Sequence, residues 1–195
     1  MAQRLLYKYR SLNNFKNFVD IILRNRLYAS LYKETNDPME GQYYYYQGNY
    51  DRRILRIIRE NKQNVRVCSL SRNNNNKLMW SHYADGQRGV AIGVMVDSDV
   101  VDLRPIIYEG LHHLSGEIDE RQAARTILIH KLNIWTYEEE ERIFLTEGVY
   151  VPAEVVQIIT GRVMSSQDFS MIRDLVNQIN PRIEVIRAEQ VMDAL

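Results

Sequence analysis

Segments with a helical spacing of apolar residues and segments with strand-like alternation follow one another in this chain in an irregular order. Helices are predicted over 15–25, from Asp51 onward, and over 78–84, 117–132 and 167–179. Strands are predicted over 5–10, 26–31, 65–71, 90–96, 103–108, 142–145, 155–163 and 182–186. Because the two kinds do not alternate strictly, the pattern favours an α+β fold with mixed or antiparallel sheets and flanking helices.

Length and composition set further limits. No linker or internal repeat divides residues 1–195, so we expect a single domain. The 25 basic and 25 acidic side chains balance, so a nucleic-acid contact has to be local. Cys68 has no partner for an internal disulfide, and neither a signal peptide nor a membrane span is recognisable. These features predict a cytoplasmic protein with no membrane partner.

Local signals refine some of the boundaries. Ser11 or Asn13 is expected to cap the first helix, and Asn36-Asp37-Pro38 is expected to form a turn. Strands 90–96 and 103–108 are candidates to pair as neighbours. The helix from Asp51 carries arginines at 52, 53, 56 and 59, which we interpret as a solvated face.

The densest acidic feature is the run Glu138–Glu141, which precedes an apolar strand. If strand geometry begins early, Glu138 and Glu140 point to one face. Crowded carboxylates raise one another's pKa, which suits general acid or base catalysis or the stabilisation of a cationic transition state. The alternative is that the four glutamates form a solvated loop.

A second group of side chains lies in the predicted helix 78–84. Trp80 and Tyr83 are one helical turn apart and can stack on a planar ligand, while His82 can donate a hydrogen bond. The alternative is a structural role, since a single histidine beside aromatic residues is more often satisfied within the fold.

The first strand supplies cations. It places Tyr7 and Tyr9 on one face and Lys8 and Arg10 on the other, and either cation suits a phosphate. The sequence contains no Gly-rich phosphate loop or nucleophile elbow. His112, His113 and His130 have no acidic or cysteine partner nearby in sequence, so no metal site is expected.

Several short motifs occur in an order that resembles a bacterial family of unknown function, domain-of-unknown-function family 2971. The motifs are Leu-Tyr-Lys-Tyr-Arg at 6–10, Leu-Tyr-Ala-Ser at 27–30, Asn-Asp-Pro-Met-Glu at 36–40, Cys-Ser-Leu-Ser at 68–71, Leu-Met-Trp-Ser-His-Tyr-Ala at 78–84 followed by Gly89 and Gly93, Trp-x-Tyr-Glu-x-Glu-x-Arg at 135–142, and Ile-Ile-Thr-Gly at 158–161. One departure is Glu141, where the family usually has an aromatic residue.

That family is distantly similar to ADP-ribosyltransferases, so the resemblance implies an ADP-ribosyltransferase-like fold that uses NAD. It implies a catalytic Glu140 with Glu138 as the auxiliary carboxylate, and Ser69 or Ser71 on a middle strand. Either Lys8 or Arg10 takes the cationic role.

The remaining expected cofactor-binding residues are Trp80 or Tyr83, which would stack on nicotinamide, together with Tyr9, His82 and Arg142. The expected function is modification of a nucleic-acid or protein target, as a toxin or phage-defence effector. Two alternatives stay open: a non-catalytic nucleotide or nucleic-acid binding module, with Tyr43–Tyr46 as a stacking surface, and a metal-dependent nuclease.

Overall fold

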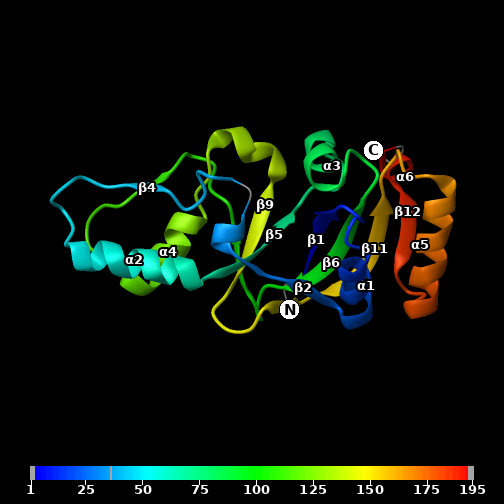
Figure 1. The fold of residues 1–195 in the computed structure, drawn as a ribbon, viewed down its shortest axis with the longest axis horizontal. Helices are drawn as coiled ribbons and strands as arrows, with labels where there is room; N and C mark the ends of the chain where they lie inside the picture. Colours follow the sequence, from blue (N-terminus) through cyan, green and yellow to red (C-terminus); the bar gives the residue numbers. More distant parts are fainter. Residues whose placement is uncertain (1–2, 36, 193–195) are drawn as a thin grey trace.

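The computed structural model describes residues 3–35 and 37–192, which form an elongated molecule with two lobes (Figure 1). An eight-stranded sheet runs through it in the order β12-β11-β6-β1-β5-β9-β7, and β3 pairs with β5 beside this path. The β11–β12 pair is parallel, and the other pairs in this sheet are antiparallel. The α+β class predicted from the sequence, with mixed and mostly antiparallel strands, is therefore confirmed.

The strands are β1 (Gln3–Arg10), β2 (Arg26–Tyr28), β3 (Ser30–Leu31), β4 (Tyr43–Tyr44), β5 (Arg66–Ser71), β6 (Val90–Asp97), β7 (Asp102–Pro105), β8 (His112–His113), β9 (Glu140–Leu145), β10 (Tyr150–Pro152), β11 (Glu154–Thr160) and β12 (Glu184–Arg187). The helices are α1 (Phe15–Arg24), α2 (Arg52–Asn64), α3 (Lys77–Tyr83), α4 (Glu120–Leu128), α5 (Ser166–Ile179) and α6 (Ala188–Met192), with two 3-10 helices, η1 (Tyr32–Glu34) and η2 (Asn133–Glu138).

The larger lobe is built on the alternation of β1 and β6. Leu6 and the even-numbered apolar residues of β6 belong to the main core, which α1 and α5 cover. Tyr7, Tyr9 and Ala91 face the opposite side and pack against α3. The period of two in the strands and the apolar stripes of α1 and α5 thus produce a sheet with a helix layer on one face and the short α3 on the other.

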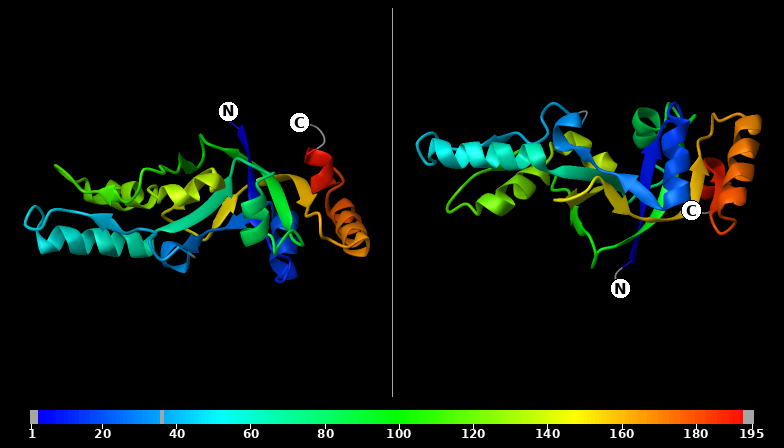
Figure 2. Two further views of the ribbon diagram at one scale, coloured as in Figure 1. Left: turned by 90° about the horizontal axis from the view of Figure 1, so that it is seen from above. Right: turned by 60° about the horizontal axis from the view of Figure 1, so that its bottom comes forward.

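The smaller lobe contains α2 and α4, which pack on each other through Ile58, Ala123 and Ile127 (Figure 1). β4 and β8 form a short parallel pair at its outer end. Seen from above, α2 lies on the β4 side of this pair and α4 on the β8 side (Figure 2). The sheet reaches this lobe through Val67 of β5 and Phe144 of β9, which pack with Ala124 and Leu128 of α4.

Several boundary predictions are wrong. The N-cap of α1 is Asn14, because the hydroxyl of Ser11 instead accepts a hydrogen bond from the backbone of Asn13 in a preceding turn. The segment 26–31 forms two strands in different sheets, since β2 pairs with β10 and β3 pairs with β5. The predicted turn is present at Asp37, whereas Asn36 lies outside the described residues.

The predicted pairing of strands 90–96 and 103–108 is also wrong. Both edges of β6 are taken by β1 and β11, so β7 pairs with β9 instead. β7 ends at Pro105 and β11 ends at Thr160, both earlier than expected.

The helix predicted over 117–132 spans only α4, Glu120–Leu128. Its last turn ends because backbone groups of Ile129 and Lys131 hydrogen-bond to Ile107 at 2.7 and 3.0 Å. This change of direction decides where the side chain of Lys131 lies.

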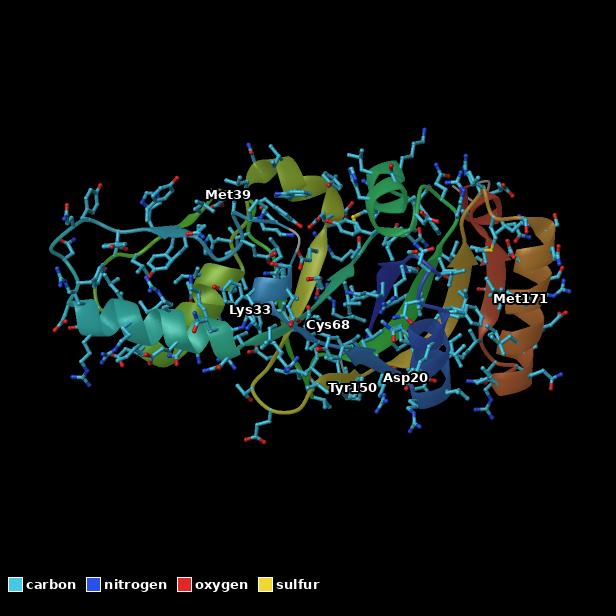
Figure 3. All side chains as sticks on the ribbon, in the orientation of Figure 1. Asp20, Lys33, Met39, Cys68, Tyr150 and Met171 are labelled. Carbon is cyan, nitrogen blue, oxygen red and sulfur yellow. The ribbon has the colours of Figure 1, made fainter. Side chains whose placement is uncertain are left out.

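Three sequence expectations concern Cys68, the membrane and the surface of α2. Cys68 is a free, buried cysteine in the main core (labelled in Figure 3). The helices of the described ranges are all too short or too polar to cross a bilayer. The arginines of α2 are exposed, as the sequence predicted.

Candidate functional site

The sheet opens at its centre, between β1 and β5. β1 pairs with β6 over its whole length, but it meets β5 at a single pair, Tyr7 with Ser71. Beyond that pair the ammonium of Lys8 crosses from β1 and donates a hydrogen bond of 2.8 Å to the carbonyl oxygen of Ser69. The two strands therefore form the sides of a wedge, which Lys8 bridges.

A cavity of about 380 Å³ lies in this wedge. It is lined by Tyr7, Lys8, Tyr9, Ser30, Glu34, Thr35, Glu40, Ser69, Leu70, Ser71, Met79, His82, Tyr83, Lys131, Glu138, Glu140 and Arg142. The lining comes from both lobes and is rich in charged and hydroxyl groups, which suits a polar ligand.

Five charged side chains form a buried cluster on the β9 side of the cavity. The ammonium of Lys131 lies 2.6 Å from an oxygen of Glu138 and 2.8 Å from an oxygen of Glu140. Arg142 binds the other oxygen of Glu140 at 2.7 Å and also pairs with Glu40. The cluster thus combines three carboxylates with two cations, so one negative charge is in excess when all five groups are ionised.

The two carboxylates nearest Lys131 have opposite pKa shifts. Burial raises the pKa of Glu138, and repulsion by Glu140 raises it further. Together these two effects outweigh the charge of Lys131, which lowers the pKa. Burial also acts on Glu140, but the charges of Arg142 and Lys131 overcome it and lower the pKa to about 2. Glu140 is therefore a fixed anion, whereas Glu138 is the carboxyl group that takes up a proton more readily.

Lys131 remains charged in this environment. Burial alone would lower its pKa, but Glu140, Glu138 and Glu40 together raise it. Its ring contact with Trp135, at 5.6 Å, covers one side of the ammonium. Lys131 thus acts as the fixed counter-charge of the two carboxylates.

Hydroxyl groups complete the polar network. The Tyr83 hydroxyl donates to the free oxygen of Glu138 at 2.6 Å. The Ser71 hydroxyl donates to the backbone oxygen of Glu138 at 2.7 Å, and the backbone amide of Glu140 donates to the Tyr108 hydroxyl at 2.8 Å. Tyr108 is neutral, since burial is the main cause that raises its pKa to about 12.

Backbone geometry brings Glu138 and Glu140 together in an unexpected way. Glu138 ends η2, Glu139 takes a left-handed conformation with φ of 44°, and Glu140 begins β9. The prediction that an early strand aligns Glu138 and Glu140 is therefore wrong, although both side chains still reach Lys131. Glu139 turns away and accepts a hydrogen bond from Asn73, and Glu141 pairs with Arg4 outside the cavity.

Most of the predicted site residues lie on this cavity. Glu138, Glu140, Ser69, Ser71, Lys8, Tyr9, His82, Tyr83 and Arg142 all line it. Of the two candidate cations of β1, Lys8 lines this cavity, and Arg10 lines a neighbouring cavity of about 440 Å³. Lys8, Tyr9, Ser30 and Tyr83 line both cavities, so the two are neighbours and are together called the cleft here.

Trp80 does not lie on the cavity. Its indole nitrogen donates to the backbone oxygen of Asn74 at 3.0 Å, and its ring meets Tyr9 edge to face at 5.2 Å. The expectation that Trp80 stacks on a ligand is corrected, because its ring is buried between α3 and the sheet. Tyr83, one turn later, is the aromatic residue of α3 that reaches the site.

Sequence reasoning missed Lys131, Glu40 and Tyr108. Glu40 ends the Asn-Asp-Pro-Met-Glu motif, which was the only signal for it. Lys131 is part of a stretch read as helix, so nothing in the sequence marked it. Within residues 3–35 and 37–192, no group of three or more His, Cys, Asp or Glu side chains is arranged to hold a metal ion.

Comparisons with family models, curated proteins and solved structures found no significant match for this chain. Its functional interpretation therefore depends on the geometry of the cleft.

Proposed function

We propose that this chain is an ADP-ribosyltransferase-like enzyme, which consumes NAD as a substrate and transfers its ADP-ribose part to a macromolecular target. The proposal depends most on one observation: two adjacent carboxylates with opposite pKa shifts, Glu138 and Glu140, share a cleft with a cation from the first strand, Lys8.

The charges along the cleft suit NAD. One part carries the cluster with an excess negative charge, which complements the cationic nicotinamide ring. The other part carries Arg10, Asn13 and Asn14, which complement phosphate oxygens. Lys8 lies between the two parts, so it is placed to contact the pyrophosphate while the nicotinamide end meets the carboxylates.

The reaction we propose breaks the bond between the ribose and the ring nitrogen of nicotinamide. The bonding electron pair goes to that nitrogen and neutralises the ring, while positive charge develops on the ribose. The fixed negative charge of Glu140 stabilises this charge at a distance. Glu138 accepts the proton of the attacking hydroxyl or amide group of the target, because its raised pKa makes it the better base.

The resemblance to domain-of-unknown-function family 2971 and to ADP-ribosyltransferases agrees with a role for Glu140 and for a cation of β1, either Lys8 or Arg10. The roles of the two glutamates differ from those that the resemblance implies, because Arg142 and Lys131 already bind both oxygens of Glu140. We therefore assign proton transfer to Glu138 and treat Glu140 as the electrostatic partner.

A second candidate is a nucleotide-binding module without catalysis. The binding of both Glu140 oxygens by Arg142 and Lys131 favours it, because a carboxylate whose oxygens are both held in ion pairs has little tendency to react. A metal-dependent nuclease has less support, since Lys131 and Arg142 occupy the positions between the carboxylates where a divalent ion would bind.

Calorimetric titration with NAD, followed by a nicotinamide-release assay, tests the proposal. We expect saturable binding that weakens in Lys8→Ala, and release that is lost in Glu138→Gln with binding retained. Glu139→Gln is the matched control, because that carboxylate neighbours both glutamates but bonds to Asn73 instead. Binding of NAD without release would favour the binding module, and the absence of both would refute NAD as the substrate.

A further inference from the structure

Tyr43–Tyr46, here called the tyrosine ladder, leave the cleft along β4 toward the outer end of the smaller lobe (Figure 1). Tyr44, Tyr45 and Tyr46 are 53%, 45% and 77% exposed, so these rings contribute little to the core. The rings nonetheless contact other aromatic side chains. Tyr43 and Tyr45 lie 6.0 Å apart with their rings tilted by 37°, and Tyr44 lies 4.9 Å from the ring of His113. The ladder is a series of accessible aromatic faces.

Helix α2 lies beside the ladder and is basic. The left view in Figure 2 shows β4 on the side of the lobe where α2 lies. The segment 51–64 carries five basic and two acidic side chains, and its arginines at 52, 53, 56 and 59 are exposed. Tyr43 packs with Ile54 and Ile58 of α2, and the ammonium of Lys62 lies 4.7 Å from its ring, so the ladder begins against this helix. Exposed aromatic rings and exposed guanidinium groups are thus both available on the smaller lobe.

We infer that the tyrosine ladder and the arginines of α2 form a binding surface for single-stranded nucleic acid. Bases stack on the tyrosine rings, and the phosphates meet the guanidinium groups. An acidic protein partner would contact only the arginines. Several exposed rings that follow one another in the chain can instead stack on successive unpaired bases. The overall charge of zero is consistent with this surface, because the basic residues are gathered locally.

The ladder starts at the wall of the cleft. The ammonium of Lys62 donates to the backbone oxygen of Gly41 at 2.5 Å and lies 4.7 Å from the ring of Tyr43. The preceding residue, Glu40, pairs with Arg142 inside the cavity. A strand bound along the ladder therefore has one end beside the carboxylates. That this strand is the acceptor of ADP-ribose rests on the proposed function, whereas the binding surface itself does not.

Fluorescence anisotropy with a labelled oligothymidine of about 12 nucleotides tests the surface at low salt and without NAD. We expect Tyr46→Ala and Tyr45→Ala each to weaken binding by about fivefold or more. Arg56→Ala is expected to reduce the slope of log affinity against log salt by about 0.7. The matched controls are Tyr150→Ala and Arg173→Ala, an exposed tyrosine and an exposed arginine of the larger lobe, which should bind as the unmodified protein does.

Three results would overturn the inference: no binding at low salt, equal losses in the control variants, or equally strong binding of a duplex of the same length. Because the titration contains no NAD, its failure says nothing against nicotinamide release. Conversely, a protein that releases no nicotinamide but still binds the oligonucleotide would refute the proposed function and support the nucleic-acid binding surface.

Discussion

Arg142 binds one oxygen of Glu140 with two guanidinium nitrogens, at 2.7 and 2.9 Å, while Lys131 takes the other oxygen at 2.8 Å. Arg142 is only 1% exposed and also donates to the backbone oxygen of Leu128 at 2.6 Å. The pair joins the start of β9 to the end of α4, and so it fixes the wall of the cavity as well as the charge within it.

Glu140→Gln is expected to lower the free energy of unfolding by about 3–5 kcal/mol, because it leaves a buried guanidinium without its main counter-charge. Chemical denaturation monitored by circular dichroism measures this change. Glu139→Gln should stay within about 0.5 kcal/mol of the unmodified protein, since that side chain is partly exposed. Equal stability of the two variants would contradict the structural role of the ion pair.

Acid should destabilise the fold through Glu140. Its pKa in the folded protein is lowered to about 2, so its stabilising contribution is present above the pKa of the unfolded chain and is lost as the pH falls through about 2. Glu138 has a raised pKa and acts in the opposite sense, since its protonated form is favoured by folding. Denaturation at a series of pH values should therefore show a loss of stability below about pH 4.5, and this loss should be smaller in Glu140→Gln.

Tyr83→Phe should raise the pKa of Glu138 further, because it removes a hydrogen bond to the ionised carboxylate. The expected readout is an upward shift of the acidic limb in the pH profile of nicotinamide release. The loss of stability should be only about 1 kcal/mol, as for one hydrogen bond. An unchanged pH profile would show that Glu138 is not the group whose ionisation controls the reaction.

Trp80→Ala is expected to cost about 3–5 kcal/mol of stability, because the ring is buried against Tyr9 and Ala91 of the sheet. Trp80→Phe keeps much of the packing and should bind NAD as the unmodified protein does. Calorimetric titration of Trp80→Phe makes the comparison. A large loss of NAD affinity in this variant would restore the stacking role that the sequence suggested for Trp80.

The sequence was informative where a single element determines the outcome. The period of β1 separated Tyr7 and Tyr9 from Lys8, and the stripes of α1, α2 and α5 were recognisable from their apolar residues. The order of strands was not recognisable, because which edge of β6 pairs with which strand depends on long-range packing.

The candidate site was predictable only where its residues belong to recognisable local motifs. Motifs drew attention to Lys8, Ser71, Tyr83 and Glu140, which lie together on the cavity. Lys131 stayed hidden because its position depends on the backbone bonds between Ile107 and Ile129 that end α4 early. Convergence of Glu138 with Glu140 likewise depends on a left-handed residue between them, which periodicity does not reveal.

The wedge between β1 and β5 has a mechanical consequence. Since these strands share a single residue pair, the hydrogen-bond network of the sheet is thinnest where the cleft lies. A ligand that contacts Lys8 on one side and Glu138 on the other links the two halves of the molecule and strengthens this joint. Ligand binding at the cleft should therefore slow amide hydrogen exchange in both strands together, because opening of the sheet between them becomes less frequent.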